Sequence, residues 1–74
     1  MILSLLKAGQ KGKILKVKGE RRLKNRLMRM GLIAGEEIEV IGIAPLGSPM
    51  DVLIKGYHLS LRKEEAACIE VDAR

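Results

Sequence analysis

Alternation of apolar and polar positions is clearest in the C-terminal third of the chain. Val52 and Ile54 are two residues apart, and apolar positions resume at 57, 59 and 61 after the pair Lys55-Gly56. A period of two places such side chains on one face of a strand, and a two-residue break that contains glycine is typical of a tight hairpin turn. The pattern therefore predicts a β-hairpin over residues 50–62.

A shorter alternation lies near the N-terminus, between Gly12 and Gly19. It predicts a strand with Leu15 and Val17 on one face and lysines on the other, while Ile14 begins the second face. Ahead of this strand, Ser4 is predicted to cap a short helical turn.

The period changes in the segment ERRLKNRLMRMG, residues 20–31. Leu23, Leu27 and Met30 are spaced i, i+4, i+7, which places them on one side of a helix. Met28 falls outside this apolar stripe, and Gly31 is a natural C-terminal stop. The pattern predicts one amphipathic helix here.

Residues 36–43, EEIEVIGI, predict a strand whose phase shifts along its length. Ile38 and Val40 share one face, whereas Ile41 and Ile43 share the opposite one. With Gly42 between the two isoleucines, this shift indicates a bulge or a sharp bend.

The last elements are a helical turn in KEEAA and a closing strand in CIEV, with Ile69 and Val71 inward. The whole pattern gives about five short strands, one helix after the first strand and a helical turn before the last. In a chain of 74 residues, this composition predicts a mainly β fold, a small curled barrel that forms a single domain over residues 1–74. The apolar runs are far shorter than the roughly 20 residues that span a bilayer, so we expect a cytoplasmic protein.

Charge is distributed unevenly along the chain. The net charge is +5, but residues 1–29 carry ten Lys or Arg against one acid, and residues 30–74 carry four against eight. The predicted helix holds a basic patch made of Arg21, Arg22, Lys24, Arg26 and Arg29. Such a patch indicates an acidic protein surface, an anionic membrane face or nucleic acid as partner, or simply a solvated face.

Nucleic acid is an alternative partner of a different class. Lys and Arg side chains would contact phosphates with strongly salt-dependent affinity. Tyr57 is the only aromatic residue, however, and a single ring does not make the stacking platform of single-strand binders. Sequence-specific recognition is therefore not expected, and binding to the phosphate backbone stays open.

Residues suited to catalysis are few. His58 is the only histidine, and Ser60 lies two residues further along the same predicted strand, so both belong to one polar face. Cys68 is the only cysteine, which excludes an internal disulfide. Its apolar neighbours indicate a small residue of the core or of its rim rather than a reactive thiol. We expect no catalytic residues and no enzymatic activity.

Metal-ligating side chains are equally few. Structural zinc usually takes four Cys or His ligands, and the chain has one of each. The pairs Glu36-Glu37 and Glu64-Glu65 offer oxygen ligands, but we interpret them as solvated turn residues. No metal site and no cofactor are expected, and weak binding of a transition metal stays open.

The segment APLGSPM, residues 44–50, is apolar where a surface loop is usually polar. Pro45 and Pro49 restrict the backbone before any binding event, which lowers the entropic cost of association. In one interpretation, Leu46 and Met50 form an apolar anchor for a partner. In the other, both side chains close the end of the barrel and contact no partner.

An ordered set of short segments extends over nearly the whole chain. They are LLKAGQKGKILKV at the start, Leu27 with Met30-Gly31-Leu32, Gly35, Ile38-Glu39-Val40, Ala44-Pro45-Leu46-Gly47 with Pro49, Gly56, Leu59-Ser60-Leu61-Arg62, Glu65-Ala66 and Ile69-Glu70-Val71. This set resembles the ferrous iron transport protein A family, FeoA. Ser48 departs from the family's pattern, which often has Asp at this position.

The resemblance implies an SH3-like β-barrel and a small cytoplasmic accessory protein of bacterial ferrous iron uptake. Its implied partner is the membrane GTPase-transporter FeoB, so we expect the protein at the inner face of the membrane. The expected partner-binding residues are Met30, Gly31, Leu32, Pro45, Leu46, Gly47, Pro49 and Met50, with the 30–32 corner beside the loop. Direct binding of ferrous iron through His58, Cys68 or carboxylates is a further alternative, and exposed strand edges leave a homo-oligomer open.

Overall fold

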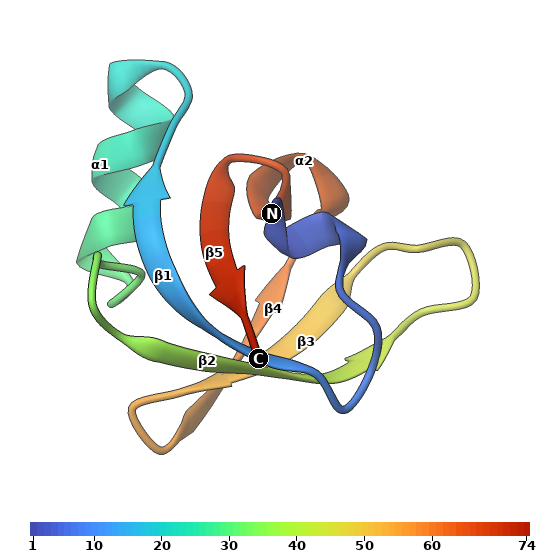
Figure 1. The fold of residues 1–74 in the computed structure, drawn as a ribbon. Coiled ribbons are helices and arrows are strands. Elements are labelled where there is room, and N and C mark those ends of the chain that lie inside the picture. Colours follow the sequence, from blue (N-terminus) through green and yellow to red (C-terminus); the bar gives the residue numbers. More distant parts are fainter.

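The computed structural model describes residues 1–74 and contains the strands and helices that the pattern predicts (Figure 1). The strands are β1 (Lys11–Val17), β2 (Glu37–Ile43), β3 (Met50–Ile54), β4 (Tyr57–Leu61) and β5 (Ile69–Ala73). Helix α1 (Arg21–Arg29) follows β1, helix α2 (Lys63–Ala66) precedes β5, and a short 3-10 helix, η1 (Leu3–Leu5), opens the chain. The predicted order of elements is confirmed.

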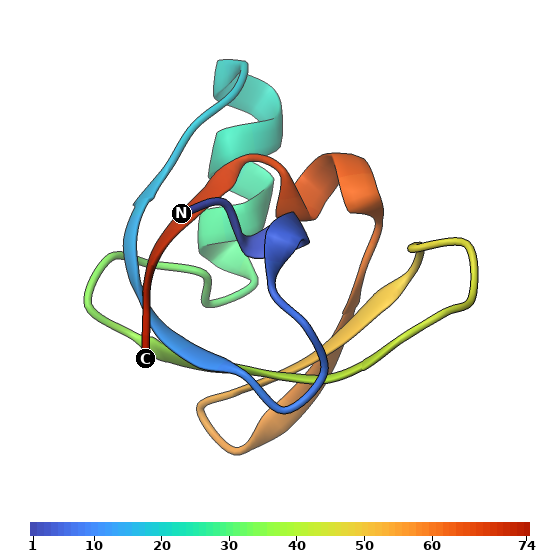
Figure 2. The same cartoon turned by 45° about the vertical axis from the view of Figure 1, so that its right-hand side comes forward.

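All five strands form one antiparallel sheet in the order β4-β3-β2-β1-β5. The sheet is strongly curved, but its edge strands β4 and β5 do not pair, so it stays open at that point (Figures 1 and 2). A bridge between Ile2 and Glu70 lays the N-terminal segment along β5. The predicted curled barrel is thus a curved sheet that does not close, and the N-terminal segment partly covers its β5 edge.

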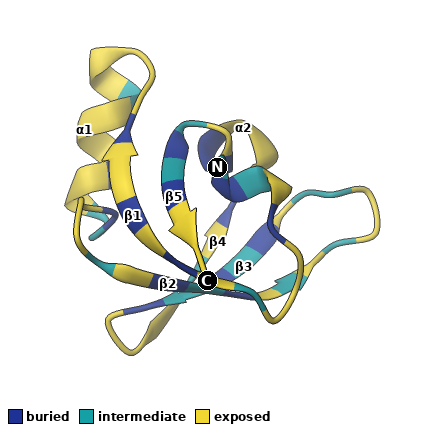
Figure 3. Ribbon diagram, viewed as in Figure 1, coloured by how far each residue is buried: buried dark blue, intermediate teal, exposed yellow.

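The curved sheet packs around a single apolar core. Fifteen buried apolar side chains form one cluster, to which every strand and α1 contribute. Figure 3 shows the buried positions along the strands and the N-terminal turn, whereas most of α1 is exposed. The predicted stripe on α1 is confirmed, since Leu27 is buried and Leu23 and Met30 pack against the core.

Strand β1 departs from the predicted alternation. Ile14 and Val17 are buried, whereas Leu15 is 48% exposed, so placing Leu15 with Val17 on the inner face is wrong. The pairing of β1 with β5 shifts register between Ile14 and Lys16. Such a bulge inserts one residue and reverses the alternation, which brings Ile14 into the core and turns Leu15 outward.

The bend predicted in β2 is confirmed. Its pairing with β3 shifts register between Val40 and Gly42. Val40, before the bulge, is fully buried, while Ile41 and Ile43 are exposed on the other face. The bulge therefore turns the strand as it enters the 44–49 loop.

Two turns show why glycine stands where it does. Lys55 and Gly56 have φ values of +52° and +83°, as a type I′ hairpin turn requires, which confirms the β3–β4 hairpin. Helix α1 ends before Gly31, whose φ is +98°.

The predicted Ser4 cap is wrong, because the residue that precedes η1 is Ile2 and no side chain caps it.

Candidate functional site

The loop between β2 and β3, residues 44–49, has a shape fixed by its own hydrogen bonds. The Gly47 N–H donates to the Ala44 carbonyl at 2.7 Å, and the Ala44 N–H donates to the Pro49 carbonyl at 3.0 Å. Pro45 occupies the second position of the resulting four-residue turn, which its fixed φ favours. The apolar loop is therefore a closed, preorganised structure.

A side-chain contact also connects this loop to the neighbouring helix. The Ser48 hydroxyl oxygen accepts a hydrogen bond of 3.1 Å from the Lys63 N–H at the start of α2. Ser48 thus has a structural partner of its own. The loop is held at its base and projects beyond the sheet (Figure 1).

Leu46 and Met50 have opposite environments. Leu46 is 92% exposed at the tip of the loop, whereas Met50 is 2% exposed and belongs to the core. The interpretation in which both side chains close the barrel end is correct for Met50 and wrong for Leu46. Leu46 faces outward, where a partner can contact it, and Met50 closes the apolar interior.

The corner made of Met30, Gly31 and Leu32 has a structural role. The Tyr57 hydroxyl donates to the Met30 carbonyl at 2.6 Å, and Leu32 is fully buried. A Cβ on residue 31 would lie 2.5 Å from the Tyr57 hydroxyl oxygen and would displace it from the Met30 carbonyl, and the φ of +98° also favours glycine here. The side chains of Leu32 and Met50 lie in the core, which removes them from the predicted contact surface.

The corner and the loop do not lie side by side. The corner contacts Tyr57 beside the β3–β4 turn, while the loop joins the opposite end of β3. A five-residue strand separates these ends by about 13 Å, and Figures 1 and 2 both show the loop far from the end of α1. The prediction that the corner lies beside the loop is therefore wrong. Of the eight predicted contact residues, Pro45, Leu46 and Pro49 are exposed, and Met30, Gly31 and Gly47 are partly exposed.

All five side chains of the basic patch on α1 are exposed. Arg22, Arg26 and Arg29 line one shallow depression, together with Glu20 and Leu23. Arg26 forms a salt bridge with Glu65, and the other four basic residues of the patch form none. The patch is therefore a positively charged surface.

Glu65 is the residue whose role sequence reasoning missed. It is nearly buried rather than solvated; it accepts a 2.8 Å hydrogen bond from the Arg62 N–H and pairs with Arg26 of α1. Its position in the helix could have predicted this role, because a Glu at the third residue of a helix often accepts a hydrogen bond from the backbone N–H of the residue that precedes the helix. Glu65 thus joins α2 to α1.

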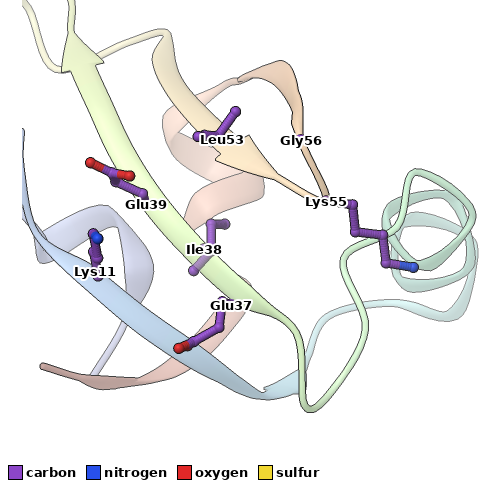
Figure 4. Close-up of a pocket in the computed structure, with 7 residues that line it drawn as sticks. All are labelled: Lys11, Glu37, Ile38, Glu39, Leu53, Lys55 and Gly56. Carbon is purple, nitrogen blue, oxygen red and sulfur yellow. The ribbon is translucent and has the colours of Figure 1, made fainter.

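A further depression lies along β2 (Figure 4). It is lined by Lys11, Glu37, Ile38, Glu39, Leu53, Lys55 and Gly56. Lys55 points away from the two glutamates in this view and forms a salt bridge with Glu36 at 3.6 Å. Glu37 pairs with Arg74 at 2.6 Å, so two of the charged groups that line this depression are engaged elsewhere.

The candidate metal ligands are separate. His58 Nδ1 lies 3.3 Å from Asp51 Oδ1 on the adjacent strand, and both side chains are exposed to solvent. The Cys68 thiol donates to the Glu64 carbonyl at 3.4 Å and packs against the core. No three His, Cys, Asp or Glu side chains form a group suited to hold a metal ion.

None of the helices η1, α1 and α2 has the length and apolarity that a membrane crossing requires.

The open five-stranded sheet with its inserted helix is a small SH3-like fold, as a solved relative shows. The crystal structure of Stenotrophomonas maltophilia FeoA complexed with zinc is described as a prokaryotic SH3 domain protein; it is 28% identical and superposes with a TM-score of 0.85, covering 97% of this chain and 89% of that one. The FeoA domain model matches residues 1–73. The chain belongs to the FeoA family, which confirms the resemblance.

Two relatives associate this family with ferrous iron transport. The chain is 33% identical over 72 residues to a putative Fe(2+) transport protein A of Campylobacter jejuni, covering 97% of both. It is 40% identical over 72 residues to a fusion of Fe(2+) transport protein A with the Fe(2+) transporter FeoB in Porphyromonas gingivalis. The match covers 97% of this chain but spans only 8% of that fusion protein.

Proposed function

We propose that this protein is a cytoplasmic, non-enzymatic interaction module that acts with a FeoB-like membrane GTPase-transporter in ferrous iron uptake. In the Porphyromonas relative, a segment similar to this chain is joined to a FeoB transporter in one polypeptide. Covalent connection keeps two domains at high effective concentration. This arrangement supports a direct contact between the corresponding separate chains.

The observation that carries the proposal is the exposure of Leu46 on a preorganised loop. A leucine side chain that moves from water into a partner's pocket contributes about 1.5–3 kcal/mol. Because the loop is already closed by hydrogen bonds and tethered to α2, little conformational entropy is lost on binding. The loop is therefore well suited to be an apolar contact point.

The basic patch on α1 supplies the electrostatic part of the proposal. Long-range attraction to an acidic protein face raises the association rate, and Lys and Arg beside a membrane are attracted to anionic lipids. The patch lies away from the loop (Figure 1). A partner that contacts Leu46 thus leaves α1 free to orient the domain.

The test is the affinity of the soluble domain of the cognate transporter for the native chain and for Leu46→Asp. We expect the substitution to weaken binding by about tenfold or more, because it replaces an apolar contact by a charge that must be desolvated. Leu5→Asp is the matched control, since Leu5 is also exposed and lies outside the loop. Equal affinity of the native chain and Leu46→Asp would remove the loop from the proposal.

A second candidate function is binding to the phosphate backbone of nucleic acids. The observation that favours it is the depression that Arg22, Arg26 and Arg29 line together with Glu20 and Leu23. Titration of duplex and single-stranded DNA at low and moderate salt tests this candidate. Salt-sensitive binding that Arg22→Ala weakens would support it, and no binding at low salt would exclude it.

A further inference from the structure

A shallow apolar groove lies between β1, α1 and the turn that follows α1. Val17 is buried and lies at the base of the groove, and Met28, Ile33 and Ala34 supply exposed apolar walls. Met28 and Ile33 also line an adjoining depression, so the apolar surface continues along the outer side of α1. This groove lies outside the Leu46 loop, and Val17 connects it to the core.

The rim of the groove carries charge of only one sign. Lys16 and Lys24 flank the apolar walls, and Arg29 and Asn25 border the adjoining depression. No carboxylate lines either hollow. An occupant that places carboxylates opposite these cations and an apolar side chain between them is complementary to the surface.

The size and shape of the groove identify the kind of occupant. Its volume is about 240 Å³, below the roughly 300–1,000 Å³ typical of small-molecule sites, which suits one or two inserted side chains. A membrane favours apolar residues that protrude, whereas Met28 and Ile33, which are 40% and 36% exposed, line a hollow together with the buried Val17. A concave site with cationic edges therefore favours a peptide over a lipid surface.

We propose that this groove binds an acidic protein segment that inserts a bulky apolar side chain between Met28 and Ile33. Carboxylates of the same segment pair with Lys16, Lys24 and Arg29. The site is distinct from the Leu46 loop, and the two surfaces allow the domain to contact two segments at once. The proposal does not rest on the contact with a transporter.

The experiment selects random short peptides on the full-length chain and measures the affinity of the recovered peptides. We expect them to combine Asp or Glu with Leu, Ile or Phe, and to bind Met28→Asp at least about tenfold more weakly. Lys24→Glu is expected to weaken binding through charge alone, with a smaller dependence on salt. Leu5→Asp is the matched control that keeps the native affinity, since Leu5 is exposed and lies outside the groove.

Amide chemical shifts locate the bound peptide and check folding. Met28 and Ile33 are surface residues, so Met28→Asp is expected to keep the native spectrum, and Ile33→Ser provides a second variant of the groove. Recovered peptides that bind Met28→Asp as well as the native chain would overturn the proposal, as would a selection that enriches no peptide. Two further measurements test the other occupants. Binding of the chain to vesicles rich in phosphatidylglycerol that Met28→Asp abolishes would overturn the proposal and assign the groove to a membrane. Self-association in sedimentation that Met28→Asp abolishes would overturn it and assign the groove to a second copy of the chain.

Discussion

At the scale of single residues, two positions four residues apart in the chain have opposite environments. Leu46 and Met50 share one apolar segment, but the turn projects the first into solvent and β3 directs the second into the core. Truncating a buried methionine costs about 2–5 kcal/mol through lost contacts and a cavity, whereas an exposed leucine has few contacts to lose. Substitution of Met50 is therefore expected to destabilise the fold, whereas substitution of Leu46 is not.

Gly31 gives a prediction at the same scale. We expect Gly31→Ala to destabilise the chain by roughly 2–3 kcal/mol, because the new Cβ combines a strained positive φ with displacement of the Tyr57 hydroxyl from the Met30 carbonyl. Urea denaturation measures the effect.

Gly35→Ala is its matched control. Its φ is +95°, but a Cβ there would meet no atom within 4 Å, so only the strain of roughly 1 kcal/mol is expected. Equal losses for both variants would show that the contact with Tyr57 contributes nothing.

At the scale of elements, the sequence predicts most strands but not their irregularities. The shift in β2 is visible because apolar residues lie on both sides of Gly42, whereas β1 carries a leucine at the position where its bulge turns outward. The alternation of residues within β1 cannot predict its register with β5, and this register places Leu15 in solvent. Glu65 is similar, since its partner Arg26 is 39 residues away.

Glu65 allows a prediction about the contact between α2 and α1. We expect Glu65→Ala to cost about 1–3 kcal/mol, because the Arg62 N–H loses its acceptor and Arg26 loses its partner. Glu64→Ala changes an exposed neighbour and is expected to stay within about 0.5 kcal/mol of the native chain. Thermal or urea unfolding measures the stability of both variants. Equal losses for Glu64→Ala and Glu65→Ala would show that the buried contacts of Glu65 contribute nothing beyond the charge of an acidic residue in this turn.

A pH dependence is expected where Lys18, just after β1, meets Glu70 of β5. The Lys18 ammonium lies 2.7 Å from the Glu70 carboxylate, and this hydrogen bond and charge lower the pKa of Glu70 below its ordinary value of 4.5. The folded state therefore favours the ionised carboxylate. The stabilising contribution is complete above this ordinary value and is lost as the pH falls through the lowered pKa.

The measurement is the unfolding free energy of the native chain and of Glu70→Gln against pH. We expect the native chain to be the more stable at neutral pH, and the difference to shrink as the pH falls below about 4.5. Added salt should reduce the difference at neutral pH, since the pair is partly exposed. A difference that is independent of pH would rule out the ion pair as its source.

At the scale of the whole molecule, the fold separates surfaces of different chemistry. The basic patch and the apolar groove lie on α1 and β1, while the Leu46 loop extends from the far end of β2 and β3 (Figure 1). A small domain with one core has a surface large enough for several contacts. This separation suits a module that connects partners rather than one that encloses a substrate.

Metal binding is a prediction for the whole chain. We expect anaerobic titration of the full-length protein with ferrous iron to give no heat beyond dilution. His58 lies beside Asp51, and Cys68 contacts the Glu64 carbonyl, whereas ferrous sites in proteins usually combine several ligands on one face. Stoichiometric heat that His58→Ala removes would contradict this expectation and assign the chain a metal site.

The sequence by itself determined the order of the strands and helices, the hairpin turn, the apolar stripe of α1 and the family. Each of these depends on residues close together in the chain or on their order, which local periodicity and turn chemistry record. Only the tertiary structure decided that Leu46 faces outward and Met50 inward, that the 30–32 corner lies far from the loop, and that Met28 and Ile33 form a groove with Val17. These outcomes depend on the register of long-range pairing and on the curvature of the sheet, which determine where separate segments meet.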